Sequence, residues 1–568
     1  MNDNVFKRRP RAVVAALLCA VGLLFAAGPP AWADGGSSGG DLQVAQTLGD
    51  RELTVTLRRV TGVPGPLHVD VLTHKGTPAG RLRLAATPTG VSTNASAANA
   101  SGTAVSTASV ALGATPGSYS AVLRVNGAGP WELSLDDGRR TARIPFVVPA
   151  QTASPPELTV YAGFVTAGVL ILITLVVAVR ARRGWWVTVP AGGAVAALAT
   201  AVTGALLSAS LPPPPAQGQQ VDPTIDGVAR PYSLVRPLTS DYSRPPASFV
   251  LRPMTAAAGD TTDLRLALYD GSTGLPADDL VVHDGALLHL LVIGPSGEFW
   301  HLHPIRTGPG AFEVRLRLPV AGHYAVSAEF ARRGGGVQQI RSATGFDAGK
   351  PPGPAPGGAV RATSPGTPPS PERPSGPGTT RTAGGVPVRL TAPSLTAGKP
   401  SALTARIGDT ATLQPWLGMV GHMIVVGPLS RADATRTTGL GEAAQDAEVW
   451  AHAHSMGGMS HVMGGTPPDS GHSARSGHSA HDMEGMSGMH PDQTSSGPPD
   501  TGSMSGLMPL NGDSPADETV AAYGPDATFV YTFPAPGHYR VWVQAERDNT
   551  ILTVPYLLHV TSPSGGTP

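Results

Sequence analysis

Two stretches of the chain, residues 248–348 and 386–562, repeat one another, so both are expected to adopt the same fold. Each contains an apolar run that starts with a histidine, then a His-x-His segment, then a Gly-His-Tyr turn. The matched segments are His289–Pro295 with His422–Pro428, His301–His303 with His452–His454, and Gly322–Tyr324 with Gly537–Tyr539. Four histidines therefore recur in the same order in both stretches.

Short alternating runs are found from Arg51 to Val148, and two further blocks, 248–348 and 386–562, have the same β-type pattern. Leu53–Leu57 and Leu67–Leu72 alternate apolar and polar residues, and Gly/Pro-rich turns separate such runs. Regular short strands of this kind are typical of β-sandwiches. We therefore expect a mainly β fold, with three immunoglobulin-like β-sandwich domains and a two-helix transmembrane hairpin.

The three predicted sandwiches differ in their histidine content. The first lacks a histidine site and carries Ser118 where the other two carry His323 and His538. Proline-rich segments without periodicity separate the domains and predict extended linkers. The predicted boundaries are 34–157 for the first sandwich, 212–247 for a linker, 248–348 for the second sandwich, 349–385 for a linker and 386–562 for the third sandwich.

Two apolar stretches, 158–179 and 187–211, are each long enough to cross a bilayer. Three arginines in the connection 180–186 predict that this loop is cytoplasmic. Residues 1–33 have the basic, apolar and small-residue order of a signal peptide, so the mature chain is expected to start at Asp34. Both large segments would then be extracytoplasmic at a bacterial cell membrane. The alternative is that the two stretches form buried helices of a soluble protein.

Charge and cysteine content exclude several function classes. The 40 basic residues balance 40 acidic ones, so the chain lacks the positive surface that nucleic-acid binding needs. The one cysteine, Cys19, lies in the predicted signal peptide. The mature chain would have no thiolate ligand for a blue-copper centre. Because hydrolase, nucleotide-binding and zinc-protease motifs are also missing, we predict that the protein is not an enzyme.

The His-x-His segments predict a metal site, because residues i and i+2 of a strand face the same side. Pro295–Gly297 fits a three-residue hairpin loop that pairs Gly294 with Glu298. In that register His289 lies opposite His303, and three histidines share one face. The alternative is that His301 and His303 are polar strand residues that face solvent.

Other histidines are weaker candidates for metal binding. His283 has the same strand parity as His289, but its counterpart in the second repeat is Trp416. His323 and His538 are candidate ligands, although the Gly-x-Tyr segment around each could instead be a structural turn anchored by the tyrosine hydroxyl. We expect His68 and His74, which have no repeat partner, to lie on the surface.

The second repeat carries an insertion, residues 455–527, that is rich in Ser, Gly, Pro and Asp and is expected to be disordered. Thioether sulfur favours Cu(I) and, by the same softness, Ag(I), whereas imidazole also serves Cu(II) and Zn(II). Copper is therefore the predicted metal, with silver or zinc as alternatives; a low-complexity linker is the alternative to a metal-binding role. The candidate ligands in this insertion are Met456, Met459, His461, Met463, His472, His478, His481, Met483, Met486, Met489 and His490.

The segments His283–Ile293 and Phe299–Pro304 resemble the YtkA-like and CopC-like immunoglobulin-type domains of bacterial extracytoplasmic copper handling. The resemblance covers residues 248–348. It also covers residues 386–562, with two departures: Trp416 replaces the first histidine, and Ser455 replaces the proline after the His-x-His segment. It implies copper binding at the cell surface. We therefore expect a membrane-anchored protein that buffers, captures or hands on copper, with a copper transporter or copper enzyme as its partner. The alternatives are a surface scaffold with no metal role or a copper-dependent redox enzyme.

Overall fold

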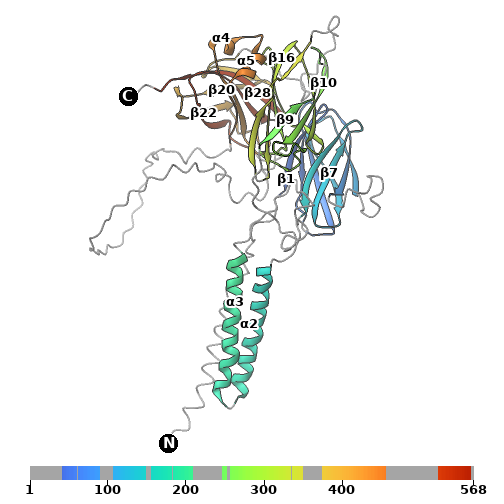
Figure 1. The fold of residues 1–568 in the computed structure, drawn as a ribbon, viewed down its shortest axis with the longest axis vertical. Helices are drawn as coiled ribbons and strands as arrows, with labels where there is room; N and C mark the ends of the chain where they lie inside the picture. The colour runs from blue at the N-terminus through green and yellow to red at the C-terminus, as the bar shows by residue number, and fades with distance from the viewer. Residues whose placement is uncertain are drawn as a thin grey trace, which may run out of the picture.

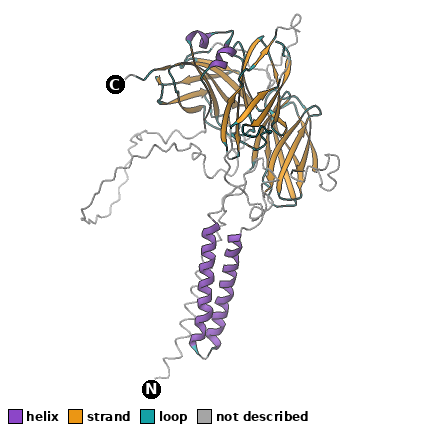
Figure 2. Ribbon diagram, viewed as in Figure 1, coloured by secondary structure: helices purple, strands orange, loops and turns teal. Residues whose placement is uncertain are grey.

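The computed structural model describes residues 41–60, 62–89, 106–148, 155–181, 183–208, 246–252, 256–333, 335–349, 374–455 and 522–563. The predicted signal peptide, most of both predicted linkers and the His/Met-rich residues 456–521 lie outside the described residues. The described part is mostly β, with six sheets and two long apolar helices (Figures 1 and 2).

The first pair of sheets encloses its own hydrophobic core. Strand β7 (Gly129–Asp136) alternates buried and half-buried residues, so one of its faces covers the core, whereas every residue of β1 (Leu42–Leu48) is buried. The sheet orders are β1 (Leu42–Leu48), β2 (Arg51–Leu57), β3 (Gly65–Thr73), β6 (Gly117–Val125), and β5 (Ser106–Leu112), β4 (Gly80–Pro88), β7 (Gly129–Asp136), β8 (Thr141–Val148).

The second pair of sheets encloses a separate core. One sheet has the order β14 (Ile305–Gly308), β15 (Ala311–Arg317), β10 (Thr261–Asp270), β9 (Ala247–Leu251). The other has the order β11 (Leu280–Val281), β16 (Gly322–Arg332), β12 (His289–Ile293), β13 (Phe299–Leu302), with β17 (Gly336–Arg341) and β18 (Phe346–Ala348) also paired to β16.

The third pair of sheets again has its own core. One sheet has the order β19 (Thr380–Ala383), β20 (Val386–Thr391), β22 (Pro400–Ile407), β26 (Asp526–Thr532). The other has the order β21 (Leu395–Thr396), β28 (Thr550–Thr561), β27 (Gly537–Arg547), β24 (Gly421–Leu429), β25 (Val449–Ser455), with β23 (Leu413–Gln414) paired to β27. Two short helices, α4 (Arg431–Thr435) and α5 (Leu440–Asp446), lie between β24 and β25.

Ordered structure extends into two segments that the sequence analysis assigned elsewhere. Strand β19 falls within the predicted linker 349–385, because Gly384 and Gly385, both with positive φ, form a tight hairpin turn to β20. Ser455 closes β25 and Tyr523 bridges Leu413, so both ends of the predicted insertion 455–527 belong to the third sheet pair.

The second and third sheet pairs pack face to face. Every residue of β12 is buried, and so is almost every residue of β24, because each strand covers its own core on one face and the other sheet pair on the opposite face. Leu291, Phe299, Ile424 and Trp542 belong to the shared apolar cluster, in which the rings of Phe299 and Trp542 stack with centroids 5.0 Å apart.

The first sheet pair contacts both others, so the three form one body (Figure 1). The Thr47 amide donates a hydrogen bond to the His303 carbonyl at 2.8 Å. His74 lies 2.8 Å from Glu546 and is 3 % exposed, so the expectation that His74 lies on the surface is wrong. His68 is exposed, as expected.

Tyrosine anchors recur at equivalent turns of the three sheet pairs. The hydroxyls of Tyr119, Tyr324 and Tyr539 donate to the backbone carbonyl four residues earlier, at 2.8, 2.6 and 2.7 Å. This confirms the structural interpretation of the Gly-x-Tyr segments.

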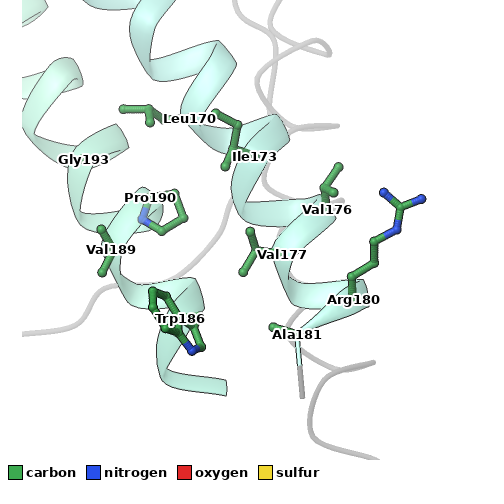
Figure 3. Close-up of a pocket in the computed structure, with 10 residues that line it drawn as sticks. All are labelled: Leu170, Ile173, Val176, Val177, Arg180, Ala181, Trp186, Val189, Pro190 and Gly193. Carbon is green, nitrogen blue, oxygen red and sulfur yellow. The ribbon is translucent and has the colours of Figure 1, made fainter. Parts of the chain in front are cut away.

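The two long helices, α2 (Pro155–Arg180) and α3 (Thr188–Ser208), are joined through the single turn η1 (Gly184–Val187) and project from the β-sheet body (Figure 1). Both are long and apolar enough to cross a membrane. They approach closely at Gly163, where an added Cβ would lie 2.8 Å from the Ala201 Cβ. An apolar groove of ≈ 790 Å³ near their connection is lined by side chains such as Val177 and Trp186 (Figure 3).

Candidate metal centre

The hairpin formed by β12 and β13 has the predicted register. The Gly294 amide donates to the Glu298 carbonyl at 2.8 Å, and Gly297 adopts the left-handed conformation that the loop requires. Leu291 then pairs with His301, which is the register that places His289 opposite His303. His289, His301 and His303 come together on one face, and one nitrogen from each lies within 4.8 Å of the others.

The first triad, defined as His289, His301 and His303, is closed to solvent. Their exposed fractions are 0, 7 and 0 %. Within the triad, His289 Nδ1 lies 3.1 Å from His301 Nε2.

The second triad, defined as His422, His452 and His454, comes from β24 and β25, which pair His422 with His454. His452 Nε2 lies 3.1 Å from His422 Nδ1 and 3.2 Å from His454 Nε2. The side chains of His422 and His452 are fully buried, whereas that of His454 is 17 % exposed.

The two triads contact each other and form a single cluster. Ring centroids of His301 and His452 lie 4.8 Å apart, and those of His289 and His452 lie 5.4 Å apart. The repeated histidine motifs by themselves predict a separate site in each repeat. The structure instead joins the two sites, because the apolar faces of β12 and β24 pack together and carry the neighbouring histidines into the same interface.

Hydrogen bonds to the outer nitrogens fix the tautomers of three imidazoles. His289 Nε2 donates to the His283 carbonyl at 3.0 Å, and His422 Nε2 donates to the Trp416 carbonyl at 3.1 Å. His301 Nδ1 donates to Gln544 Oε1 at 2.9 Å. Since a neutral imidazole has one N–H, the inward nitrogens of these three residues carry lone pairs.

Carboxylates face the outer nitrogens of the other three imidazoles. His303 Nδ1 lies 2.5 Å from Glu52 Oε1 of the first sheet pair. His452 Nδ1 lies 3.4 Å from Glu329, and His454 Nδ1 lies 3.4 Å from Asp284. The inward His303 Nε2 is buried and has no hydrogen-bond partner among the described residues.

Burial disfavours the charged form of four of the clustered imidazoles. It lowers the pKa of His289 to about 3, with repulsion from His303 adding to the effect. Burial also lowers the pKa values of His301, His422 and His452 well below the usual value. At neutral pH these imidazoles are therefore unprotonated on one nitrogen, which is the form that binds metals.

His283 lies beside the triads and belongs to a different group. Its Nε2 lies 2.9 Å from Asp284 and 4.0 Å from Glu329, and its side chain is 29 % exposed. These three side chains form a further possible ligand set at the edge of the buried cluster. Trp416, which stands at the position of His283 in the second repeat, packs against the ring of His422 with centroids 4.8 Å apart and so borders the cluster.

His323 and His538 are not part of the cluster, so the structure does not bring these two predicted ligands together with the others. His323 Nδ1 contacts Asp347 at 2.9 Å, and the His538 ring lies 4.7 Å from that of His559. Each is next to an anchoring tyrosine at its turn, which places it outside the triads. The candidate ligands from Met456 to His490 lie outside the described residues.

Sequence reasoning missed the residues that support the imidazoles. Glu329 and Gln544 each follow the turn histidine of their repeat by six residues, a spacing that could have identified them. Glu52 has no comparable signal, because it precedes His303 by 251 residues and belongs to another sheet pair.

A domain of unknown function, DUF8832, matches residues 483–562, which is well under half of the chain. No curated protein matches. Similar solved structures include a tetra-tandem repeat from the extending region of a large adhesion protein, at 8 % identity, 92 % coverage of this chain, 74 % coverage of that one and a TM-score of 0.15. A Salmonella alpha-2-macroglobulin reacted with methylamine has 8 % identity, coverages of 91 and 24 %, and a TM-score of 0.16. TM-scores this low do not establish a shared fold.

Proposed function

We propose that the protein is a membrane-anchored, extracytoplasmic copper-binding protein that buffers copper, captures it or hands it on. The observation that carries this proposal is the set of imidazole nitrogens that face one another in the buried cluster without a proton between them. His289 Nδ1 and His301 Nε2, at 3.1 Å, are the clearest pair.

The histidine geometry fits a metal ion. Two lone pairs that face each other in a buried site repel unless a cation lies between them. Two nitrogens bound to one tetrahedral ion at roughly 2.0–2.1 Å lie roughly 3.3–3.4 Å apart. The separations of 3.1 and 3.2 Å within the triads are close to this value. When bound, the ion would be held by the inward nitrogens, and the partners of the outer nitrogens would fix the ring orientations.

The residues after β25 favour copper over zinc or nickel. Met456 is two positions after His454 in the sequence, and the methionines that follow it are soft thioether ligands suited to Cu(I). A His/Met-rich segment attached directly to the second triad would raise the local concentration of captured copper beside the cluster. Silver shares this chemistry, and zinc is compatible with the imidazoles alone.

The two long helices support a membrane anchor. Their apolar side chains point outward, for example Val165 and Leu206, which are 67 and 71 % exposed. The sheets lie together at one end of the helical pair, opposite the arginine-containing connection (Figure 1). This arrangement is consistent with three immunoglobulin-like sandwiches outside a bacterial cell and the connection inside.

Copper stoichiometry of the full chain in detergent tests the metal proposal. Dialysis against a chelator that strips copper from a synthetic peptide of residues 456–521 would restrict the measurement to the buried cluster. We expect the wild-type chain to retain copper and the double variant His301→Ala/His452→Ala to lose it. The matched control is His323→Ala/His538→Ala, which should behave as wild type. Equal retention by all three proteins, or by none, would contradict the proposal.

Impermeant labelling of intact cells tests the topology. Single cysteines introduced at Ser37 and at Ser564 should both react, whereas one introduced at Arg182 should not. Protection of either of the first two positions would contradict the proposed orientation.

A further inference from the structure

We infer that the histidine cluster is a dinuclear centre that holds one metal ion in each triad. The inference rests on the proposed metal-binding function and goes further, because a single shared ion would satisfy that function equally well.

The number of available ligands favours two ions. In the first triad two lone pairs, on His289 Nδ1 and His301 Nε2, face each other, and in the second the lone pair of His422 Nδ1 faces His452 Nε2. A tetrahedral ion accepts four ligands, so a single ion would leave inward lone pairs of a six-histidine cluster buried without a partner. If the single ion were bound by His301, His422 and His452, the lone pair of the solvent-excluded His303 Nε2 would be left without a partner.

The repeat supports the same conclusion. The second triad is built from the equivalent positions of the third sheet pair, with the same backbone-carbonyl contact at His422 as at His289. Each triad therefore uses equivalent positions of its repeat. Among the described residues, the nitrogens within 4.8 Å of one another are those of His289, His301 and His303 in the first triad, whereas His422 and His452 form such a set with His301. A three-histidine set with one position open is a common way to bind a transition metal.

The supporting contacts cross between the sheet pairs. Gln544 of the third pair orients His301 of the first triad. Glu329 and Asp284 of the second pair face His452 and His454 of the second triad. Each ion would thus be held by one repeat and oriented by the other, which makes the two sites parts of a single centre.

Charge also permits two neighbouring cations. The carboxylates of Glu52, Asp284 and Glu329 contact outer nitrogens from both triads. Glu52 and Asp284 offset part of the repulsion that two ions would otherwise experience in a buried site, whereas burial raises the pKa of Glu329 to about 7 and so weakens its contribution. The ring centroids of His301 and His422 are 5.6 Å apart across the triads, so the two ions would be close neighbours.

Titration of the metal-free full chain with Co(II) tests the inference. Co(II) is a suitable probe because imidazole binds it, whereas thioethers favour softer ions such as Cu(I). Four-coordinate Co(II) also absorbs visible light far more strongly than six-coordinate Co(II) bound loosely elsewhere. We expect the strong bands to saturate at two equivalents in the wild-type chain.

Two single variants separate the two ions. His303→Ala should remove one equivalent and leave the second triad loaded, and His454→Ala should remove the other. The partly exposed His454 provides the test if His303→Ala does not fold, and His323→Ala is the matched control. If the wild-type chain instead saturated at one equivalent and either variant abolished that binding, the cluster would hold a single shared ion. This outcome would overturn the dinuclear centre but leave metal binding intact. If the wild-type chain bound neither Co(II) nor copper, the proposed function would be overturned as well.

Discussion

His289 Nδ1 lies 3.1 Å from His301 Nε2, and hydrogen bonds on the far side of each ring place a lone pair on both nitrogens. Two buried acceptors facing each other in this way raise the free energy of the metal-free protein. A bound cation converts the same contact into two favourable interactions.

Metal binding should therefore stabilise the folded chain. At a free metal concentration one hundred times Kd, one bound ion raises the free energy of unfolding by about 2.7 kcal/mol. Thermal unfolding with and without copper should show the higher midpoint in the loaded protein. In His301→Ala the increase should be lost or greatly reduced, and an undiminished increase would show that copper stabilises the chain elsewhere.

Glu52→Gln should weaken metal binding without removing a ligand. Glu52 lies 2.5 Å from His303 Nδ1 and holds its Nε2 toward the cluster. Loss of such an orienting carboxylate costs about 10–100-fold in metal affinity. A competition titration measures the change, with Asp50→Asn, whose side chain is 56 % exposed, as the control. Unchanged affinity would mean that the first sheet pair does not support the site.

Phe299→Ala should reduce metal affinity although Phe299 is not a ligand in the proposed centre. Its ring stacks on Trp542 between the second and third sheet pairs, and such a truncation typically costs about 3–5 kcal/mol. Because each triad is supported by residues of the opposite sheet pair, loosening this interface should weaken both sites. Val337→Ala, at a position 53 % exposed, is the control for stability and affinity. Loss of stability with full affinity would argue against this coupling.

Gly163→Leu should separate the two long helices. Even a Cβ at this position would lie 2.9 Å from the Ala197 carbonyl oxygen. Small residues at such contacts allow helices to pack closely within a membrane. Helical thermal stability in detergent should fall, whereas Gly168→Leu should have little effect because no atom lies within 4 Å of an added Cβ there. Equal effects of the two variants would contradict this contact.

Asp270→Asn should destabilise the protein in a pH-dependent way. Hydrogen bonds from Ser272 and Arg332 lower the pKa of the Asp270 carboxyl below its ordinary value of 3.8. A lowered folded-state pKa contributes stability above pH 3.8, and that stability is lost as the pH falls further.

Denaturant unfolding of the wild type and Asp270→Asn measures this effect. The difference should be about 1–3 kcal/mol at pH 7 and should shrink below pH 3.8. Asp548→Asn is the control, because the Asp548 side chain is 83 % exposed. A difference that stays constant with pH would exclude the charged contact with Arg332 as its source.

Local sequence determined the architecture of the first triad. The Pro295–Gly297 loop fixed the hairpin register, and the period of two residues along a strand then placed His289, His301 and His303 on one face. This inference depends only on residues close together in the chain. In the second repeat, helices α4 and α5 stand between β24 and β25 in place of the short loop, so no tight turn fixes the pairing of His422 with His454.

Tertiary structure alone decided how these parts meet. Glu52 reaches His303 from 251 residues away, and His74 reaches Glu546 from 472 residues away. Strand periodicity shows that a face is apolar but does not identify the face that covers it, because that choice depends on the complementary shapes of distant surfaces. From the sequence, the two histidine triads are expected to form separate sites. The packing of β12 against β24 instead joins them into one buried cluster.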